Sequence, residues 1–107
     1  MKLIMFNEEQ RKDITEPILG NAQTKLQKYY EVPGIHAGIW ECHAGEFTIE
    51  SHASHEVCFI LEGECNVTLN DASVQRLKTG DSFIIPKGTK MIWTIEKYIR
   101  KVYMAAQ

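Results

Sequence analysis

Long hydrophobic runs are missing from this chain of 107 residues. No stretch approaches the roughly 20 consecutive apolar residues that a membrane-spanning helix needs. The apolar run near the amino terminus, residues 3–6, is too short for the core of a secretion signal, and two acidic residues soon follow it. No block of like charge occurs, and the net charge is −2. We therefore expect no electrostatic recruitment to a membrane or to nucleic acid.

Cysteine is scarce, and its spacing shows no pairing. The three cysteines, Cys42, Cys58 and Cys65, are an odd number, and none belongs to a Cys-x-x-Cys motif. Without a secretion signal, this usage is typical of reduced thiols that are buried as small hydrophobic side chains. We therefore expect a cytoplasmic protein without structural disulfides.

Sustained helical periodicity is also missing. The chain is long enough for one domain with a single core, and residues 1–34 are predicted to be an irregular N-terminal arm of that domain. Residues 1–6 suit an opening strand, and residues 7–16 suit at most a short helical turn before Pro17. Breakers such as Gly20 and Pro33 interrupt the rest. For residues 24–30 a turn of helix and an edge strand both remain open.

From residue 35 to the end, the pattern is that of β-structure. Short segments rich in β-branched and aromatic residues alternate with turn signals such as Asn70-Asp71 and Pro86-Lys87-Gly88. The strands predicted from this pattern are 35–42, 47–52, 57–61, 66–69, 74–77, 83–85, 90–95 and 98–104. Many short strands at such spacing indicate an all-β, antiparallel sandwich or barrel over residues 35–107.

Polar side chains gather on one face around residue 50. Glu50 and His52 have the same strand parity, and Glu56 shares it if no bulge intervenes, whereas His55 has the opposite parity. Two carboxylates and one imidazole suit a divalent ion such as Mn²⁺, Fe²⁺ or Zn²⁺. The alternative is a set of ordinary surface charges around a polar loop.

The spacing of these residues resembles the two motifs of the cupin superfamily. The first cupin motif is matched by Gly45, Glu50-x-His52, Glu56 and Gly63, and the second by Gly80 and Pro86-x-Gly88. Met91 stands where the second motif has its histidine. The resemblance implies an antiparallel jelly-roll barrel of the cupin type, with its functional site inside the barrel.

A finer resemblance is to small single-domain cupins related to ureidoglycine aminohydrolase and to an ethanolamine-utilisation cupin. It is carried by residues spread over 35–104: Gly38-x-Trp40-Glu41, Leu61-Glu62-Gly63, Gly80-Asp81-Ser82, Trp93 and Arg100-Lys101-x-Tyr103. The aminohydrolase holds Mn²⁺ with a Glu-x-His-x3-His set and a Gln. Here Glu50 and His52 match that set, and Glu56 replaces its second histidine. Met91 replaces the fourth ligand with a thioether, which is a poor ligand for a hard ion, so the implied site is incomplete.

The function expected from this resemblance is the binding of a polar small molecule inside the barrel. If the protein is an enzyme, the chemistry resembles that of an aminohydrolase or an isomerase, with catalytic roles for His52, Glu50 and Glu56. A metal-free, non-catalytic binding or sensory module remains the alternative, and a purely structural role explains the inward polar residues least. Further pocket candidates are Cys58, Met91, Trp93, Lys101 and Tyr103, whereas His36 and His43 are expected at the surface. Apolar residues on the outer face of segment 57–61 predict a homodimer.

Overall fold

The computed structural model describes residues 2–7, 11–16 and 18–107, and it places no helix among them. Accordingly, no helix in the described ranges is suited to crossing a membrane. Its strands are β1 (Lys12–Ile14), β2 (Leu19–Gly20), β3 (Thr24–Val32), β4 (Ile35–Ile49), β5 (His55–Leu69), β6 (Val74–Lys78), β7 (Ser82–Ile85) and β8 (Met91–Ala106).

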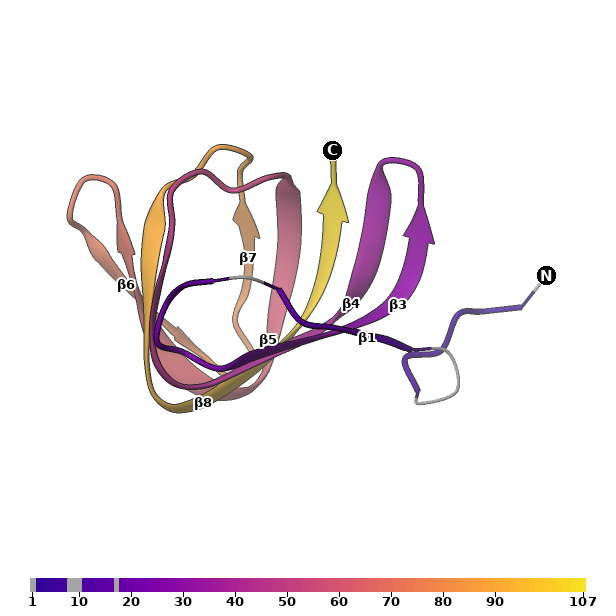
Figure 1. Ribbon diagram of the computed structural model, residues 1–107, viewed down its shortest axis with the longest axis horizontal. Helices are drawn as coiled ribbons and strands as arrows, with labels where there is room; N and C mark the ends of the chain where they lie inside the picture. Colours follow the sequence, from indigo (N-terminus) through magenta and orange to yellow (C-terminus); the bar gives the residue numbers. More distant parts are fainter. Residues whose placement is uncertain (1, 8–10, 17) are drawn as a thin grey trace.

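The strands form one antiparallel sheet that rolls around an interior (Figure 1). Along the sheet the order is β1-β3-β4-β8-β5-β6, with β2 paired to β4 and β7 paired to β5. Each pairing is antiparallel, and strands that are distant in sequence, such as β4 and β8, lie side by side. The predicted all-β, antiparallel jelly-roll barrel is confirmed.

Three of the gaps between predicted strands, at 43–46, 62–65 and 96–97, are bends inside long strands and not strand ends. Segment 35–42 and the first part of segment 47–52 belong to the single strand β4, which has a bulge between His43 and Gly45 and ends at Ile49. Segments 57–61 and 66–69 join in β5 across register shifts near Gly63, and segments 90–95 and 98–104 join in β8. A bulge or a glycine with positive φ bends a strand without ending its pairing. Each long strand therefore contributes to two walls of the barrel (Figure 1).

The predicted irregular N-terminal arm was wrong at three segments, which form β1, β2 and β3. β3 pairs with β4 from Thr24 to Val32, so residues 24–30 form a strand and not a turn of helix. This strand is not at the edge of the sheet throughout, because β1 pairs with its other side. The predicted helical turn gives way to strand at Lys12–Ile14, while residues 8–10 lie outside the described part. Residues 2–6 form no strand. β4 supplies the backbone hydrogen-bonding partners of β2 and β3, and β3 supplies those of β1, which the polar sequence of the arm could not reveal.

The core lies on the inner face of the rolled sheet. Along β5, Glu56, Cys58 and Ile60 are buried, whereas Val57 and Phe59 between them are exposed on the outside. The same alternation in β8 turns Lys101, Tyr103 and Ala105 inward. Two of these inward positions carry charge, and they mark the floor of a cavity.

Candidate functional site

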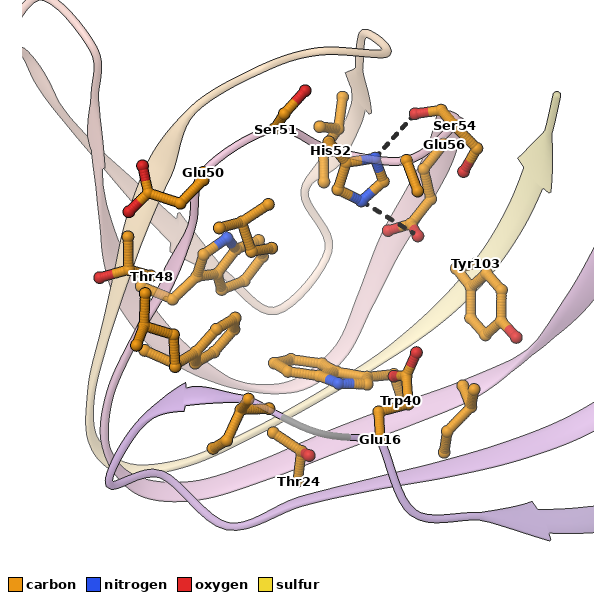
Figure 2. Close-up of a pocket in the computed structure, with 18 of the residues that line it drawn as sticks. Glu16, Thr24, Trp40, Thr48, Glu50, Ser51, His52, Ser54, Glu56 and Tyr103 are labelled. Carbon is orange, nitrogen blue, oxygen red and sulfur yellow. Dashed lines mark hydrogen bonds and ion pairs between the residues drawn. The ribbon is translucent and has the colours of Figure 1, made fainter.

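A cavity of about 470 Å³ opens inside the barrel, and its wall combines aromatic and polar side chains (Figure 2). The aromatic residues are Trp40, Phe47, Trp93 and Tyr103. The polar residues come from the arm, from β4, from the loop between β4 and β5, and from β5 and β8: Glu16, Thr24, His36, Thr48, Glu50, Ser51, His52, Ser54, Glu56 and Lys101. A cavity of this size and composition suits a small organic molecule.

A buried ion pair lies on the floor of the cavity. The Lys101 ammonium donates a hydrogen bond to Glu56 Oε2 over 2.7 Å, and both side chains are about nine-tenths buried. Burial alone raises the pKa of Glu56, but the positive charge of Lys101 and the hydrogen bonds to the carboxylate outweigh burial, so the pKa is lowered. Burial likewise lowers the pKa of Lys101, and Glu56 outweighs it in the opposite direction. Both groups are therefore charged at neutral pH.

Two indole rings flank the ammonium of Lys101. Its Nζ lies 4.8 Å from the ring centre of Trp40 and 4.9 Å from that of Trp93. The two rings meet edge to face, with their centres 5.5 Å apart. Aromatic faces attract a cation, and the attraction is stronger where water is excluded. The barrel thus holds the Lys101 charge by a carboxylate and by two aromatic faces.

His52 lies at the upper side of the cavity, in the loop between β4 and β5 (Figure 2). Its backbone N–H donates to the Thr89 carbonyl, and its own carbonyl accepts from the Gly88 N–H, so the loop after β7 holds it in place. The ring nitrogen Nδ1 lies 2.7 Å from the Ser54 carbonyl oxygen. Because a carbonyl can only accept, Nδ1 carries a proton. The other nitrogen, Nε2, faces Glu56 Oε1 at 3.6 Å.

The predicted trio of metal ligands does not come together. His52 and Glu56 face each other, but Glu50 points away from them at the rim (Figure 2). Its carboxylate lies 3.7 Å from the Lys90 ammonium, and its side chain is 65% exposed. The expected convergence was wrong for Glu50, because the strand ends at Ile49 and the loop that follows does not keep strand parity.

The remaining side chains do not fit a divalent ion. Within the described ranges, no three His, Cys, Asp or Glu side chains are grouped closely enough to hold one. The carboxylate that a metal would need, Glu56, is already bound to the Lys101 ammonium. A divalent ion at that oxygen would lie against a fixed positive charge.

The other pocket candidates divide between the cavity and the core. Trp93, Lys101 and Tyr103 line the cavity. Cys58 and Met91 are fully buried but are not part of the cavity wall. Cys58 donates its S–H to Glu56 Oε2 over 3.0 Å, and burial raises the pKa of its thiol to about 12. Met91 pairs in the sheet with Ile49 of β4 and Leu69 of β5, and its side chain belongs to the hydrophobic core and not to the cavity wall that His52 and Glu56 share.

Sequence reasoning missed several residues of the wall. His36 was expected at the surface, but it lines the cavity and its Nδ1 lies 3.1 Å from the Tyr103 hydroxyl oxygen. Strand parity with Trp40 could have placed it there. His43 is exposed, as expected. Glu16 and Thr24 belong to the arm, and only the pairing of β3 with β4 brings that arm over the cavity.

One polar atom of the wall has no described partner. Trp93 Nε1 is buried, and no acceptor for its N–H lies among the residues that the structure describes. A buried donor without an acceptor is costly, and in native proteins it usually has a reason.

Comparisons with known proteins agree with this fold. The family model described as "EutQ-like cupin domain" matches residues 33–103. No curated protein matches the chain significantly. The EutQ protein of Clostridium difficile is 18% identical, with a TM-score of 0.72, over 96% of this chain and 80% of that one.

Two further solved structures are similar to this chain, one with higher and one with lower sequence identity. A DUF861 family protein from Thermotoga maritima is 34% identical, with a TM-score of 0.59, over 63% of this chain and 75% of that one. The iron(II) form of the protein HppE is 14% identical, with a TM-score of 0.77, over 96% of this chain and 60% of that one. At 14% and 18% identity the likeness is one of fold.

Proposed function

This chain belongs to the EutQ-like cupin domain family, and from that premise we propose that it binds a small polar molecule in the cavity of its barrel. The single observation that carries the proposal is the cavity of about 470 Å³, where charged and aromatic side chains converge from separate elements. The core alone does not explain a buried Lys101–Glu56 pair at this place, because a buried ion pair is weak evidence for stability. The three cysteines are free thiols, which supports the cytoplasm as its compartment.

The wall indicates the chemistry of the ligand. Trp40, Phe47 and Trp93 offer flat apolar surface for a planar or apolar body. The Lys101 ammonium has three N–H donors, of which Glu56 accepts one. A further N–H suits an acceptor oxygen of the ligand, such as a carbonyl or carboxylate oxygen. We therefore propose a small metabolite that carries such an oxygen.

Tryptophan fluorescence is a direct test. The chain has two tryptophans, and both line the cavity. A panel of small keto acids, amides and carboxylated amines should contain compounds that change this emission and raise the melting temperature, because a ligand that binds only the folded state stabilises it.

The matched variants for this test are His52→Ala and His55→Ala. His52 faces the cavity, whereas His55 is exposed and its Nδ1 accepts from the Lys87 backbone N–H. His52→Ala should weaken binding by about tenfold, the loss of roughly 1.4 kcal/mol, and His55→Ala should leave it unchanged. A panel without any binder, or binders that are indifferent to His52→Ala, would contradict the proposal.

A second candidate function is acid–base chemistry of the isomerase type. It is favoured by the fixed orientation of His52, whose Nδ1–H is bound by Ser54 while Nε2 faces Glu56 and the cavity. Such an imidazole can take a proton from a carbon next to a carbonyl group and return it elsewhere. Metal-dependent chemistry of the aminohydrolase type is less well supported, because the donor set does not fit a divalent ion.

Hydrogen–deuterium exchange tests the second candidate. A bound keto acid in D₂O should exchange its α-hydrogens faster with the wild type than with His52→Ala, whereas His55→Ala should behave like the wild type. Equal exchange in all three proteins would leave binding as the function and exclude His52 as a base.

A further inference from the structure

We propose that the Lys101 ammonium is the resident cation of this barrel, and that it keeps divalent metal ions away from Glu56 and His52. In this view Lys101 on strand β8 supplies the positive charge beside Glu56 that a bound metal ion would otherwise supply. The inference concerns the site itself and stands without any ligand of the cavity.

The first support is the position of the ammonium. Lys101 lies on β8 between Trp40 of β4 and Ile60 of β5, which are its neighbours across the sheet. From there its Nζ reaches Glu56 Oε2 at 2.7 Å, close to the oxygen that faces His52 Nε2 at 3.6 Å. An ion held by Glu56 and His52 together would share this space with the ammonium.

The second support is that the ammonium cannot move aside into water. Lys101 is 6% exposed, although a lysine side chain near a surface normally extends its charge into solvent. Here the indole rings of Trp40 and Trp93 close around it at 4.8 and 4.9 Å. Those rings attract a monovalent organic cation but offer no lone pair to a metal ion.

The third support is the charge of the floor. Glu56 is a buried carboxylate, and the titratable groups that face it are the Lys101 ammonium at 2.7 Å, the Cys58 thiol at 3.0 Å and His52 Nε2 at 3.6 Å. One ammonium neutralises one carboxylate, so no net negative charge remains to attract a second cation. The Cys58 S–H and the ammonium both bind the same oxygen, Oε2, and fix the carboxylate further.

Metal titration after removal of the ammonium tests the proposal. In Lys101→Met the charge disappears while a side chain of similar length remains, and Glu56 is then a buried carboxylate without its cation. Titration calorimetry with Zn²⁺ and with Mn²⁺ should show at least about tenfold tighter binding to Lys101→Met than to the wild type. Lys97→Met is the matched control, because Lys97 lies on the same strand but is exposed; it should behave like the wild type.

A second substitution tells whether a gained ion sits on the floor. The double variant Lys101→Met with His52→Ala should lose the gained affinity, because His52 is the other donor. An unchanged affinity for both ions in Lys101→Met would overturn the proposal. So would wild-type protein that binds one Zn²⁺ through His52, and that measurement does not require Lys101→Met to fold.

Unfolding by denaturant supplies an independent readout that needs no metal. Glu56→Gln and Lys101→Met should each lower the midpoint, because each leaves one buried charge unpaired, and the two together should recover part of the loss. Losses that simply add would show that Lys101 is not the cation that Glu56 depends on. Success here with no binder in the fluorescence panel would sink the proposed ligand binding but leave this inference intact.

Discussion

Ion pairs in this protein contribute differently to its stability, depending on how far they are buried. Arg76 and Glu64 approach to 2.6 Å, but both are exposed, and such pairs contribute about 0–1 kcal/mol. The Lys101–Glu56 pair has similar geometry inside the barrel, where breaking a pair by removing one partner costs about 3–5 kcal/mol. The contribution of an ion pair to the stability of this protein therefore depends on its burial more than on the distance between its charged atoms.

Two corner glycines provide a test of backbone strain against steric clash. Gly63 has φ +87°, and a Cβ at this position would lie 2.1 Å from the Tyr98 carbonyl oxygen. Gly80 has φ +93°, but a Cβ there meets no atom within 4 Å. Gly80→Ala should lower the free energy of unfolding by about 1 kcal/mol, which is the cost of a non-glycine residue in the left-handed region. Gly63→Ala should lower it by about 3 kcal/mol or more, because the backbone must also move.

Denaturant unfolding of both variants measures the difference. Gly34→Ala is a useful control, since Gly34 also has a positive φ and open space around the added Cβ. It should behave like Gly80→Ala. Equal losses at Gly63 and Gly80 would mean that the close approach of Tyr98 to β5 relaxes without cost.

Long bent strands are the elements that build the cavity. β4 brings Trp40 and Phe47 to the cavity from either side of its bulge, and β8 brings Lys101 and Trp93 from either side of its own bend. Had each strand ended at its bend, these pairs would belong to separate elements with independent registers. A single strand with a bulge keeps both side chains on the inner face.

Residues 1–7 should contribute less to the stability of the fold than the segment up to residue 21, which contains β1 and β2. Phe6 stacks on Tyr29 with ring centres 4.7 Å apart, and such a pair is worth about 0.5–1.5 kcal/mol. Ile14 and Ile18 pack against the core. Deletion of residues 1–7 should therefore lower the unfolding free energy by about 1 kcal/mol, whereas deletion of residues 1–21 should lower it by several times as much.

Melting curves of the two truncated proteins and of the wild type decide this point. The fluorescence of Trp40 and Trp93 follows the same transition from within the barrel. A large loss from the shorter deletion would show that residues 2–7 contribute more than the Phe6–Tyr29 stack.

At the scale of the whole molecule, the outer surface of the barrel carries a group of exposed apolar side chains. Ile84, Val57, Phe59 and Met104 are 66%, 49%, 41% and 48% exposed. Val57 is paired with Ile84 on one side and with Met104 on the other, so these residues form one outer apolar face across β7, β5 and β8. Contiguous apolar surface on a small protein commonly marks an interaction site.

We propose that two copies of the chain associate through this outer apolar face. Light scattering at micromolar concentration should give the mass of a dimer. Val57→Glu should give a monomer, because it places a charge in the centre of the face. Val74→Glu on β6 is the matched control, since Val74 is 59% exposed but lies outside that face. Wild-type protein with the mass of a monomer would contradict the proposal.

The local pattern of the sequence predicted the strands after residue 35 and an antiparallel sandwich or barrel, and the spacing of the two cupin motifs added the jelly roll and part of the candidate site. Alternation placed Glu56 on the face of His52, Lys101 was among the pocket candidates, and the spacing of Gly45, His52, Glu56 and Gly63 marked the region of the cavity. These features depend on neighbours within a few residues, so a sequence displays them. The arm escaped prediction because its strands carry no apolar alternation of their own and are stabilised by pairing with other strands: β3 with β4, β2 with the far end of β4, and β1 with β3.

Only the tertiary structure decided what the inner residues do together. The parity that grouped Glu50 with His52 ends with β4 at Ile49, and the loop turns Glu50 toward Lys90. The register of β8 between β4 and β5 then places Lys101 against Glu56, 45 residues away, and between two tryptophans. Such a contact depends on strand register and on side-chain reach across the barrel, neither of which is a property of any short stretch of sequence.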